Sequence, residues 1–219
     1  MYSGRLHSSK ALPVLLRAVS RARATVPHLH VFLAGSDSDQ GLELRRLATE
    51  MGLASAVHFT GLLSRPRLAS VLCASDAVAL TPYPGENFGN ACVEAMGLGL
   101  PAILSDNVGA AERAAEDGAA MVTPVDADAI AQAIVQLAAD PEMHQRMARA
   151  AADSVRNRYS PQAVAPPKAV GVPLLGKLLA LTGQQRSVQE LNAALESGGV
   201  RKRVFCSEGT RRSPWDCTP

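Results

Sequence analysis

The sequence predicts an α/β fold, a Rossmann-like doubly wound parallel sheet, on two observations. Short continuous apolar runs alternate with segments of helical apolar spacing from the start of the chain to about residue 160. Alternation of this kind favours parallel strands with helices on both faces of the sheet. In addition, the loops that carry glycine and polar residues follow these runs, and such sheets bind ligands at the carboxyl ends of their strands. Pattern and motif therefore support the same fold.

The expected elements can be placed in order along the chain. The runs that predict buried strands are 30–34, 57–59, 77–80, 101–104 and 120–122. Between them, three apolar faces recur at helical spacing: Leu44, Leu47, Ala48 and Met51; Leu68, Val71 and Leu72; and Ile130, Ile134 and Leu137. We expect a helix over each face, lying between two strands of the sheet.

Length and composition suit one α/β domain with an appendage. The chain has 219 residues, of which 47% are apolar, and its net charge is +2. Residues 165 to 219 hold eight Lys and Arg against four Asp and Glu, whereas residues 1 to 164 hold fourteen against sixteen. We therefore expect a near-neutral domain over 1–164 and a basic, loosely ordered tail over 165–219, with no nucleic-acid surface on the domain.

The four cysteines and the lengths of the apolar runs indicate the redox setting of the protein and its relation to the membrane. Cys73, Cys92, Cys206 and Cys217 show no paired spacing, and the first residues do not read as a signal sequence. A reduced, cytoplasmic setting is expected, without a disulfide framework or a zinc site. No apolar run is long enough to span a bilayer, so contact with the inner membrane surface would be peripheral.

The most informative segment is 82–100, a Pro/Gly turn followed by two glutamates eight positions apart. Glu86 is expected in the loop and Glu94 inside a helix. At helical rise eight residues span up to about 12 Å, which is the reach of a sugar joined to a ribose through a pyrophosphate. The segment Glu86-Asn87-Phe88-Gly89, with Glu94-Ala95 after it, resembles the nucleotide-sugar signature of group 1, or family 4, retaining glycosyltransferases. The resemblance implies the C-terminal, donor-binding half of a GT-B fold.

The resemblance assigns roles to the two acids and the residues between them. Glu86 would contact the donor sugar and steady the charge that grows at the anomeric carbon, as the catalytic carboxylate. Glu94 would accept hydrogen bonds from the ribose hydroxyls. The amides of Gly89 and Asn90, at the helix start, would contact the diphosphate. Phe88 would either touch the donor or anchor the loop.

Further donor contacts are implied near other strand ends. Gly4-Arg5-Leu6 and Lys10 match the pattern in which Arg and Lys bind the diphosphate, Arg5 with two parallel hydrogen bonds and Lys10 as a point charge. Gly35 opens a loop that matches only fairly. Gly61 and Leu62 would hold the base. No metal or other cofactor is expected, because Arg5, Lys10 and the helix start together would neutralise the pyrophosphate.

The sequence also departs from the family in four ways. Ala11 follows Lys10 where the family has glycine, and only Met1, Tyr2 and Ser3 stand where it has a full inner strand. Loss of that strand would leave ladder groups unpaired, at about 1–3 kcal/mol for each buried group. The family's N-terminal acceptor domain has no counterpart in this sequence, and the family pattern stops near Pro166.

Three interpretations remain open at this stage. The leading one is a donor-binding domain for hexosyl transfer to an acceptor in glycan or glycolipid synthesis, incomplete alone. The second is a non-catalytic binding module for a separately encoded acceptor domain. The third is another Rossmann-type enzyme, such as a sugar-nucleotide epimerase or an oxidoreductase. Neither the dinucleotide fingerprint nor the ATP phosphate loop is present, which argues against nicotinamide and ATP chemistry.

Overall fold

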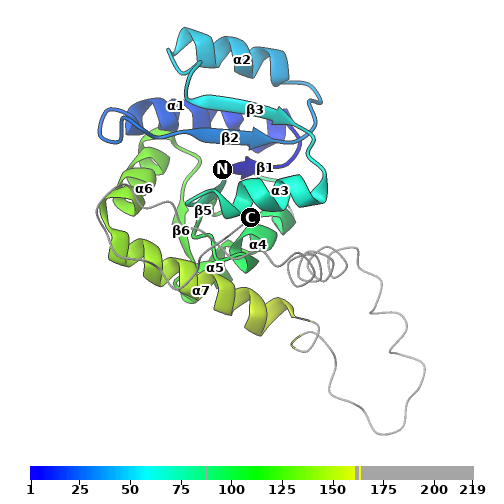
Figure 1. Ribbon diagram of the computed structural model, residues 1–219, viewed down its shortest axis with the longest axis vertical. Helices are drawn as coiled ribbons and strands as arrows, with labels where there is room; N and C mark the ends of the chain where they lie inside the picture. Colours follow the sequence, from blue (N-terminus) through cyan, green and yellow to red (C-terminus); the bar gives the residue numbers. More distant parts are fainter. Residues whose placement is uncertain (87, 161–162, 164–219) are drawn as a thin grey trace, which may run out of the picture.

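A computed structural model of the chain describes residues 1–86, 88–160 and 163, and it confirms the predicted α/β fold (Figure 1). Two sets of parallel strands are present, in the orders β1-β2-β3 and β4-β5-β6. Their bounds are β1 Tyr2–Ser3, β2 Val31–Ala34, β3 Val57–Gly61, β4 Val78–Leu80, β5 Ala102–Ser105 and β6 Ala120–Thr123. Each of the five predicted strands is present, with ends that shift by one or two residues.

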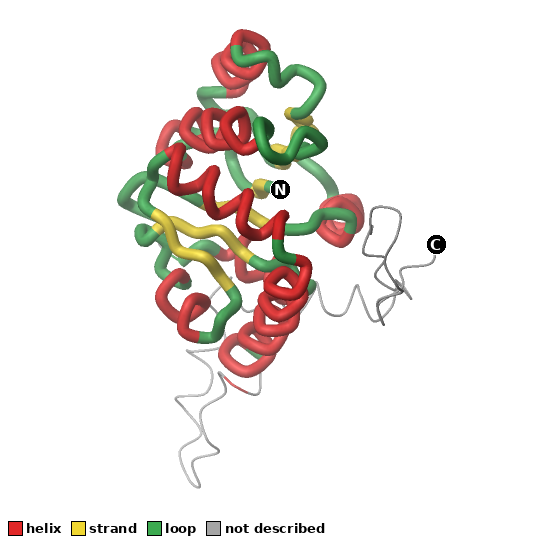
Figure 2. Tube along the Cα trace, turned by 90° about the vertical axis from the view of Figure 1, so that its left-hand side faces the viewer, coloured by secondary structure: helices red, strands yellow, loops and turns green. Residues whose placement is uncertain are grey.

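Helices cover both sides of these strands, as the tube in Figure 2 shows. Several begin at a proline or at a capping aspartate: the Asp126 carboxylate accepts the amides of Asp128 and Ala129, and that of Asp140 accepts the amide of Met143. A short 3-10 turn, η1, spans Ser8–Lys10. The α-helices are α1 Leu12–Ala22, α2 Gly41–Glu50, α3 Arg65–Cys73, α4 Asn90–Gly97, α5 Ala111–Glu116, α6 Ala127–Ala139 and α7 Pro141–Tyr159.

The middle of the sheet is formed by β1 and β4. Although β1 has only two residues, Tyr2 pairs with Leu33 and Ser3 with Ala34. On its other side the Ala79 amide donates to the Met1 carbonyl (2.8 Å), and the Met1 amine donates to the Ala77 carbonyl (2.8 Å). The strand order across the molecule is therefore 3-2-1-4-5-6. Successive strands are added toward one edge of the sheet up to β3 and toward the other edge from β4 on, so the strand order reverses between β1 and β4. The loss of backbone pairing at the inner strand is smaller than predicted, because residues 1–3 still form hydrogen bonds to the strands on both sides.

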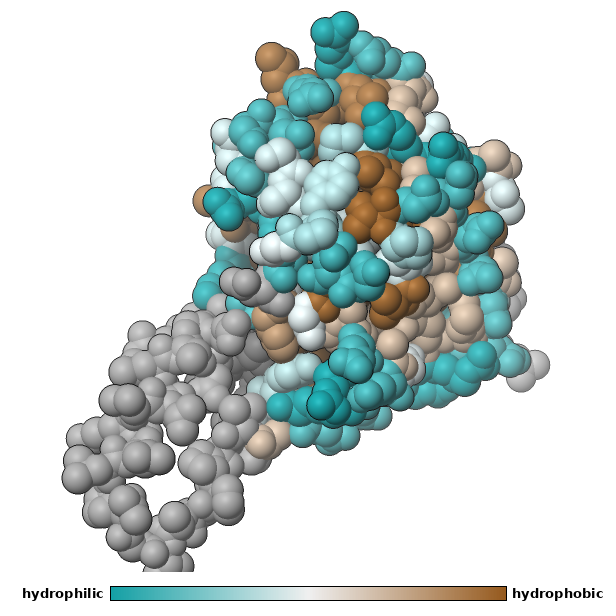
Figure 3. Space-filling model, turned by 180° about the vertical axis from the view of Figure 1, so that it is seen from behind, coloured by the Kyte–Doolittle hydropathy of each residue, from teal (hydrophilic) through white to brown (hydrophobic). Residues whose placement is uncertain are grey.

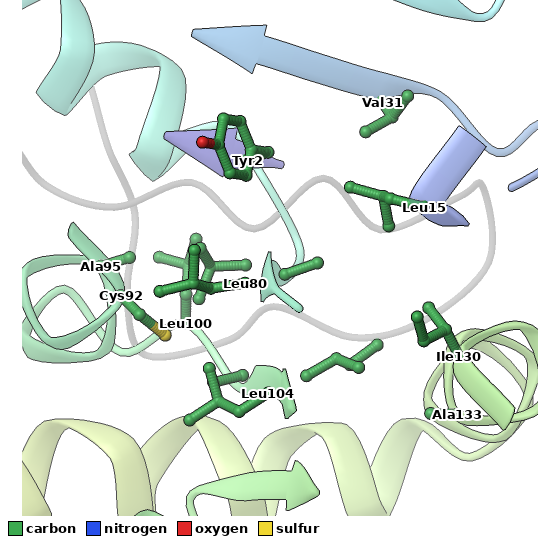
Figure 4. Close-up of a cluster of buried hydrophobic side chains, with 14 of the residues drawn as sticks. Tyr2, Leu15, Val31, Leu80, Cys92, Ala95, Leu100, Leu104, Ile130 and Ala133 are labelled. Carbon is green, nitrogen blue, oxygen red and sulfur yellow. The ribbon is translucent and has the colours of Figure 1, made fainter. Parts of the chain in front are cut away.

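The core runs along both faces of this junction (Figure 4). Tyr2, Leu33, Leu80 and Leu104 bring strand side chains into it, and Leu15 and Ile130 bring side chains from α1 and α6. Alanines such as Ala95, Ala102 and Ala133 let helices approach the strands closely. Tyr2 is fully buried, so the strand that leads into the first glycine loop is held firmly in place.

The remaining surface is mixed in character. On the rear face in Figure 3, brown side chains form small groups between teal ones. Among the described residues, no helix combines the length and the apolar character that a bilayer-spanning segment needs. The predicted basic tail, 165–219, lies outside the described residues.

Candidate functional site

Four loops that the sequence singled out lie at one edge of the sheet, because all the paired strands are parallel. Gly4 to Lys10 follow β1, Gly35 to Asp37 follow β2, Gly61 ends β3 with Leu62 after it, and Pro82 to Gly89 follow β4. The strand order reverses between β1 and β4, and ligands of doubly wound sheets bind at such a point. The loops after β1 and β4 flank it.

The first loop is fixed by Tyr2 and by its neighbour after β2. The Tyr2 hydroxyl donates to the Arg5 carbonyl (2.7 Å), and the Leu6 amide donates to the Ser36 carbonyl (2.9 Å). A Cβ on Gly35 would lie 1.8 Å from the Gly4 carbonyl oxygen. Position 35 therefore requires glycine, because the two backbones touch there. This contact gives the glycine of that loop a packing role.

Lys10 ends the turn η1, and its side chain reaches the loop after β4. His7 caps the turn by accepting the Ser9 amide at Nδ1 (3.2 Å). Ala11 then adopts a left-handed conformation at φ 50°, which is favourable for glycine and costs about 1–2 kcal/mol for other residues. This accounts for the family's glycine at the position that Ala11 fills. The chain then enters α1, leaving the ammonium group of Lys10 directed at Glu86.

Glu86 forms an ion pair with Lys10. The two side chains are only 16% and 18% exposed, respectively, so most of the surrounding water is excluded. Burial and the nearby Glu86 carboxylate raise the pKa of Tyr2 well above its usual range. An acid, a lysine and a buried tyrosine therefore meet where β1 and β4 end.

The loop that carries Glu86 is anchored at both of its ends. The Pro82 carbonyl accepts the Ser105 hydroxyl (3.1 Å) and the Asn107 amide (3.3 Å), and the Tyr83 amide donates to the Ser9 carbonyl (3.0 Å). Beyond Glu86, the Phe88 carbonyl accepts the Ala110 amide (3.2 Å).

Gly89 closes this loop and caps α4. Its φ is 87°, and a Cβ there would lie 2.6 Å from the Val108 side chain. Glycine is required at this position on both grounds. Asn90 is the first residue of α4 and is exposed, whereas Glu94, one turn further on, is half-buried. Because the helix begins only at Asn90, the helical estimate of 12 Å between Glu86 and Glu94 does not hold for the whole interval.

The other predicted site residues differ in their surroundings. Arg5 is exposed, and among the described residues its guanidinium has no ion-pair partner. Leu62 is 80% exposed beside Gly61, at the end of β3. Phe88 is half-buried and packs edge-on against Tyr159 of α7, with ring centroids 5.3 Å apart. Of its two predicted roles, this contact corresponds to the loop anchor.

The supports beneath the site were only partly predicted. Tyr2, Ser105 and Asn107 hold the two loops in place. The sequence pattern places a candidate site loop at 105–109, after the apolar run 101–104, but it gave no sign of the contacts with Pro82 or of the role of Tyr2. The His30 and His58 rings are stacked with centroids 5.2 Å apart, and His30 Nδ1 lies within hydrogen-bond distance of His58 Nε2 (2.9 Å). Two histidines alone do not make a metal site, and within the described ranges no group of three His, Cys, Asp or Glu could hold a metal.

Comparison with known proteins places these observations in a family. The family model for glycosyl transferases group 1 matches residues 1–154. A D-inositol 3-phosphate glycosyltransferase from Mycolicibacterium gilvum is 38% identical over 154 residues, which cover 67% of this chain and 34% of that protein. The Streptomyces avermitilis protein of the same name is 33% identical over 162 residues, covering 69% and 34%. The chain spans about a third of the length of these relatives.

Solved structures show the same half of a GT-B fold. Anabaena Alr3699/HepE in complex with UDP and glucose has a TM-score of 0.63 and 27% identity, covering 72% of this chain and 43% of that one. The C-terminal domain of a group 1 protein, LpcC from Francisella tularensis, has a TM-score of 0.66 and 21% identity, covering 72% and 84%. The second likeness, at low identity, establishes the fold alone.

Proposed function

The chain belongs to the glycosyl transferases group 1, and on this premise we propose that residues 1–160 form a domain that binds a nucleoside-diphosphate sugar for glycosyl transfer. The observation that carries the proposal is the Lys10–Glu86 pair at the point where the strand order reverses. In this pair, an ammonium group that could bind a phosphate is in direct contact with a carboxylate that could bind a sugar. That the Anabaena neighbour was solved with UDP and glucose supports a donor of this class.

The roles follow from the charges at this edge. Arg5, exposed and with no ion-pair partner among the described residues, is available to a diphosphate, and its planar guanidinium suits two phosphate oxygens. Lys10 would supply the second positive charge. The start of α4 adds backbone amides, whose dipole favours an anion. These groups would neutralise the pyrophosphate without a metal ion.

The carboxylates would act at the two ends of the donor. Glu94 would accept the ribose hydroxyls, and Glu86 would contact the sugar and stabilise positive charge at its anomeric carbon. In the transfer itself, the bond from the anomeric carbon to the diphosphate breaks and its electron pair leaves with the nucleotide. The acceptor oxygen forms the new bond on the same face and loses its proton to the departing phosphate. This retaining course needs no protein nucleophile.

The acceptor would be held by a second domain, since the chain spans about a third of its relatives. We therefore expect this chain to bind donor weakly and to show little or no transfer by itself. The proposal requires an acceptor-binding domain as the partner of this donor-binding domain.

Calorimetric titration with UDP, ADP, GDP and UDP-glucose tests the proposal. Wild-type protein should bind at least one nucleotide, and Arg5→Ala and Glu94→Ala should each weaken binding about tenfold or more. Arg146→Ala serves as the control, because it removes one positive charge from a part of α7 that lies away from the site loops. Two residues before Arg146, the His144 ring bonds to the Asp76 carbonyl (2.8 Å), which precedes β4 and so lies at the opposite edge of the sheet. This control should bind like wild type. Absence of binding to every nucleotide, or equal binding in all variants, would refute the proposal.

A further inference from the structure

The loop that carries Glu86 also has a side-chain support from α7. The Phe88 ring meets the Tyr159 ring at an interplanar angle of 80°, with centroids 5.3 Å apart. Edge-on contact at this separation is the favoured geometry of an aromatic pair. Both rings belong to the partly buried set that packs against the core. Tyr159 therefore limits where Phe88 can lie, two residues beyond Glu86.

Tyr159 is in turn held in place by an ion pair next to it in the sequence. Arg158 donates two hydrogen bonds of 2.6 Å to the Asp117 carboxylate, through Nε and Nη2. The Ser154 hydroxyl, one turn earlier in α7, donates to the same carboxylate (2.6 Å). These bonds hold the pKa of Asp117 at about 2. Because Asp117 caps the end of α5, the last turn of α7 is attached to that helix.

The described residues on either side of Glu86 are restrained by different contacts. The anchors at Pro82 and Tyr83 lie before Glu86, and Gly85, next to it, has a positive φ, with no heavy atom within 4 Å of where a Cβ would stand. After Glu86, Phe88 is held by its carbonyl and by its ring, and Gly89 is fixed as the N-cap of α4. Removal of the ring contact would take away the side-chain restraint on Phe88 and leave the backbone restraints in place.

We propose that Tyr159 is a positioning residue, which sets the place of Glu86 through the Phe88 ring. The inference rests on the proposed function insofar as Glu86 contacts the donor sugar. It adds a residue outside the signature motif, 71 positions from Phe88 in sequence. Tyr159 itself touches neither the sugar nor the diphosphate; its effect is confined to the loop.

The test compares three variants in nucleotide binding. In Tyr159→Ala, the ratio of UDP-glucose to UDP affinity should fall about 3- to 10-fold, the range expected from the loss of one aromatic pair. Affinity for UDP alone should change less than twofold, because Arg5 and Lys10 lie on the loop after β1. Tyr159→Phe keeps the ring and should restore the ratio. Val155→Ala, which removes buried volume from the same helix facing Gly97, should lower the melting temperature and leave the ratio unchanged.

Hydrogen exchange gives a second measurement that does not depend on nucleotide binding. Amides of the loop after β4 should exchange about 3- to 10-fold faster in Tyr159→Ala than in wild type, and no faster in Val155→Ala. If the wild type binds no nucleotide, the proposed function fails, while faster exchange still supports the role of Tyr159 in holding the loop. Unchanged exchange, or faster exchange with an unchanged affinity ratio, overturns the inference.

Discussion

Lys10 and Glu86 neutralise each other before any ligand arrives, so a bound diphosphate must share Lys10 with the carboxylate. Both anions would then contact the same ammonium group and lie about 5 Å apart. At an effective dielectric of about 20 such charges repel by about 3 kcal/mol. Because the two side chains keep 16% and 18% exposure, we expect about 1–2 kcal/mol to remain. Glu86→Gln should therefore tighten binding of UDP alone by about 5- to 30-fold.

The assay is calorimetric titration of UDP into wild type, Glu86→Gln, Lys10→Met and the double variant at low salt. Lys10→Met should weaken UDP binding, and Glu86→Gln should tighten it in that background as well, because the carboxylate repels the diphosphate directly. UDP-glucose should gain less than UDP from Glu86→Gln, because the sugar loses its carboxylate. If Glu86→Gln binds UDP no more tightly than wild type, the two anions do not compete for Lys10 and the reasoning is wrong.

Three further predictions concern stability and reactivity. Gly35→Ala should lower the free energy of unfolding by about 3 kcal/mol or more in urea titrations, because the new methyl group meets backbone; Gly118→Ala, where a Cβ meets nothing within 4 Å, should cost only its backbone strain of about 1 kcal/mol. The pKa of Asp117 is lowered from 3.8 to about 2, so its contribution to stability is complete above about pH 4 and lost as the pH falls through 2. Allowing for partial exposure, this contribution amounts to about 1 kcal/mol, and Arg158→Ala should remove it. In urea titrations from pH 5 to pH 2, the free energy of unfolding should therefore fall less steeply with pH in Arg158→Ala than in wild type. Equal slopes would argue against the ion pair. Burial raises the pKa of Cys92 to about 12, so iodoacetamide at pH 8 should leave this thiol unmodified until the protein unfolds, and rapid labelling of the folded chain, detected by peptide mass spectrometry, would contradict its burial.

The fold could be predicted from the sequence because its signals are local. The apolar run 101–104 is followed by polar residues, and it forms a strand, Ala102–Ser105, almost where expected. The first strand was harder, since two residues carry no periodic signal. Its existence depends on partners far along the chain, Leu33 on one side and Ala79 on the other.

The site was predicted in composition but not in its contacts. The sequence placed Lys10 and Glu86 in one site, yet it did not show the direct pairing of these two residues, which are 76 positions apart in the chain. Tyr2 read as part of a short strand, and only the structure shows its hydroxyl on the Arg5 carbonyl. The position of Phe88 stayed open between donor and anchor, because α7 had to be placed before Tyr159 could be found beside it.

The junction between β1 and β4 divides the sheet into two halves of three strands each. Arg5 and Lys10 belong to the half on one side, and Glu86 and Glu94 belong to the other. Among the described residues, the polar contacts that cross it include the bonds of Met1 with Ala77 and Ala79, the bond from Tyr83 to Ser9 and the Lys10–Glu86 ion pair. Sliding along this junction would move the cations past the acids, so the alignment of the whole site depends on these contacts and on the core packed across the junction.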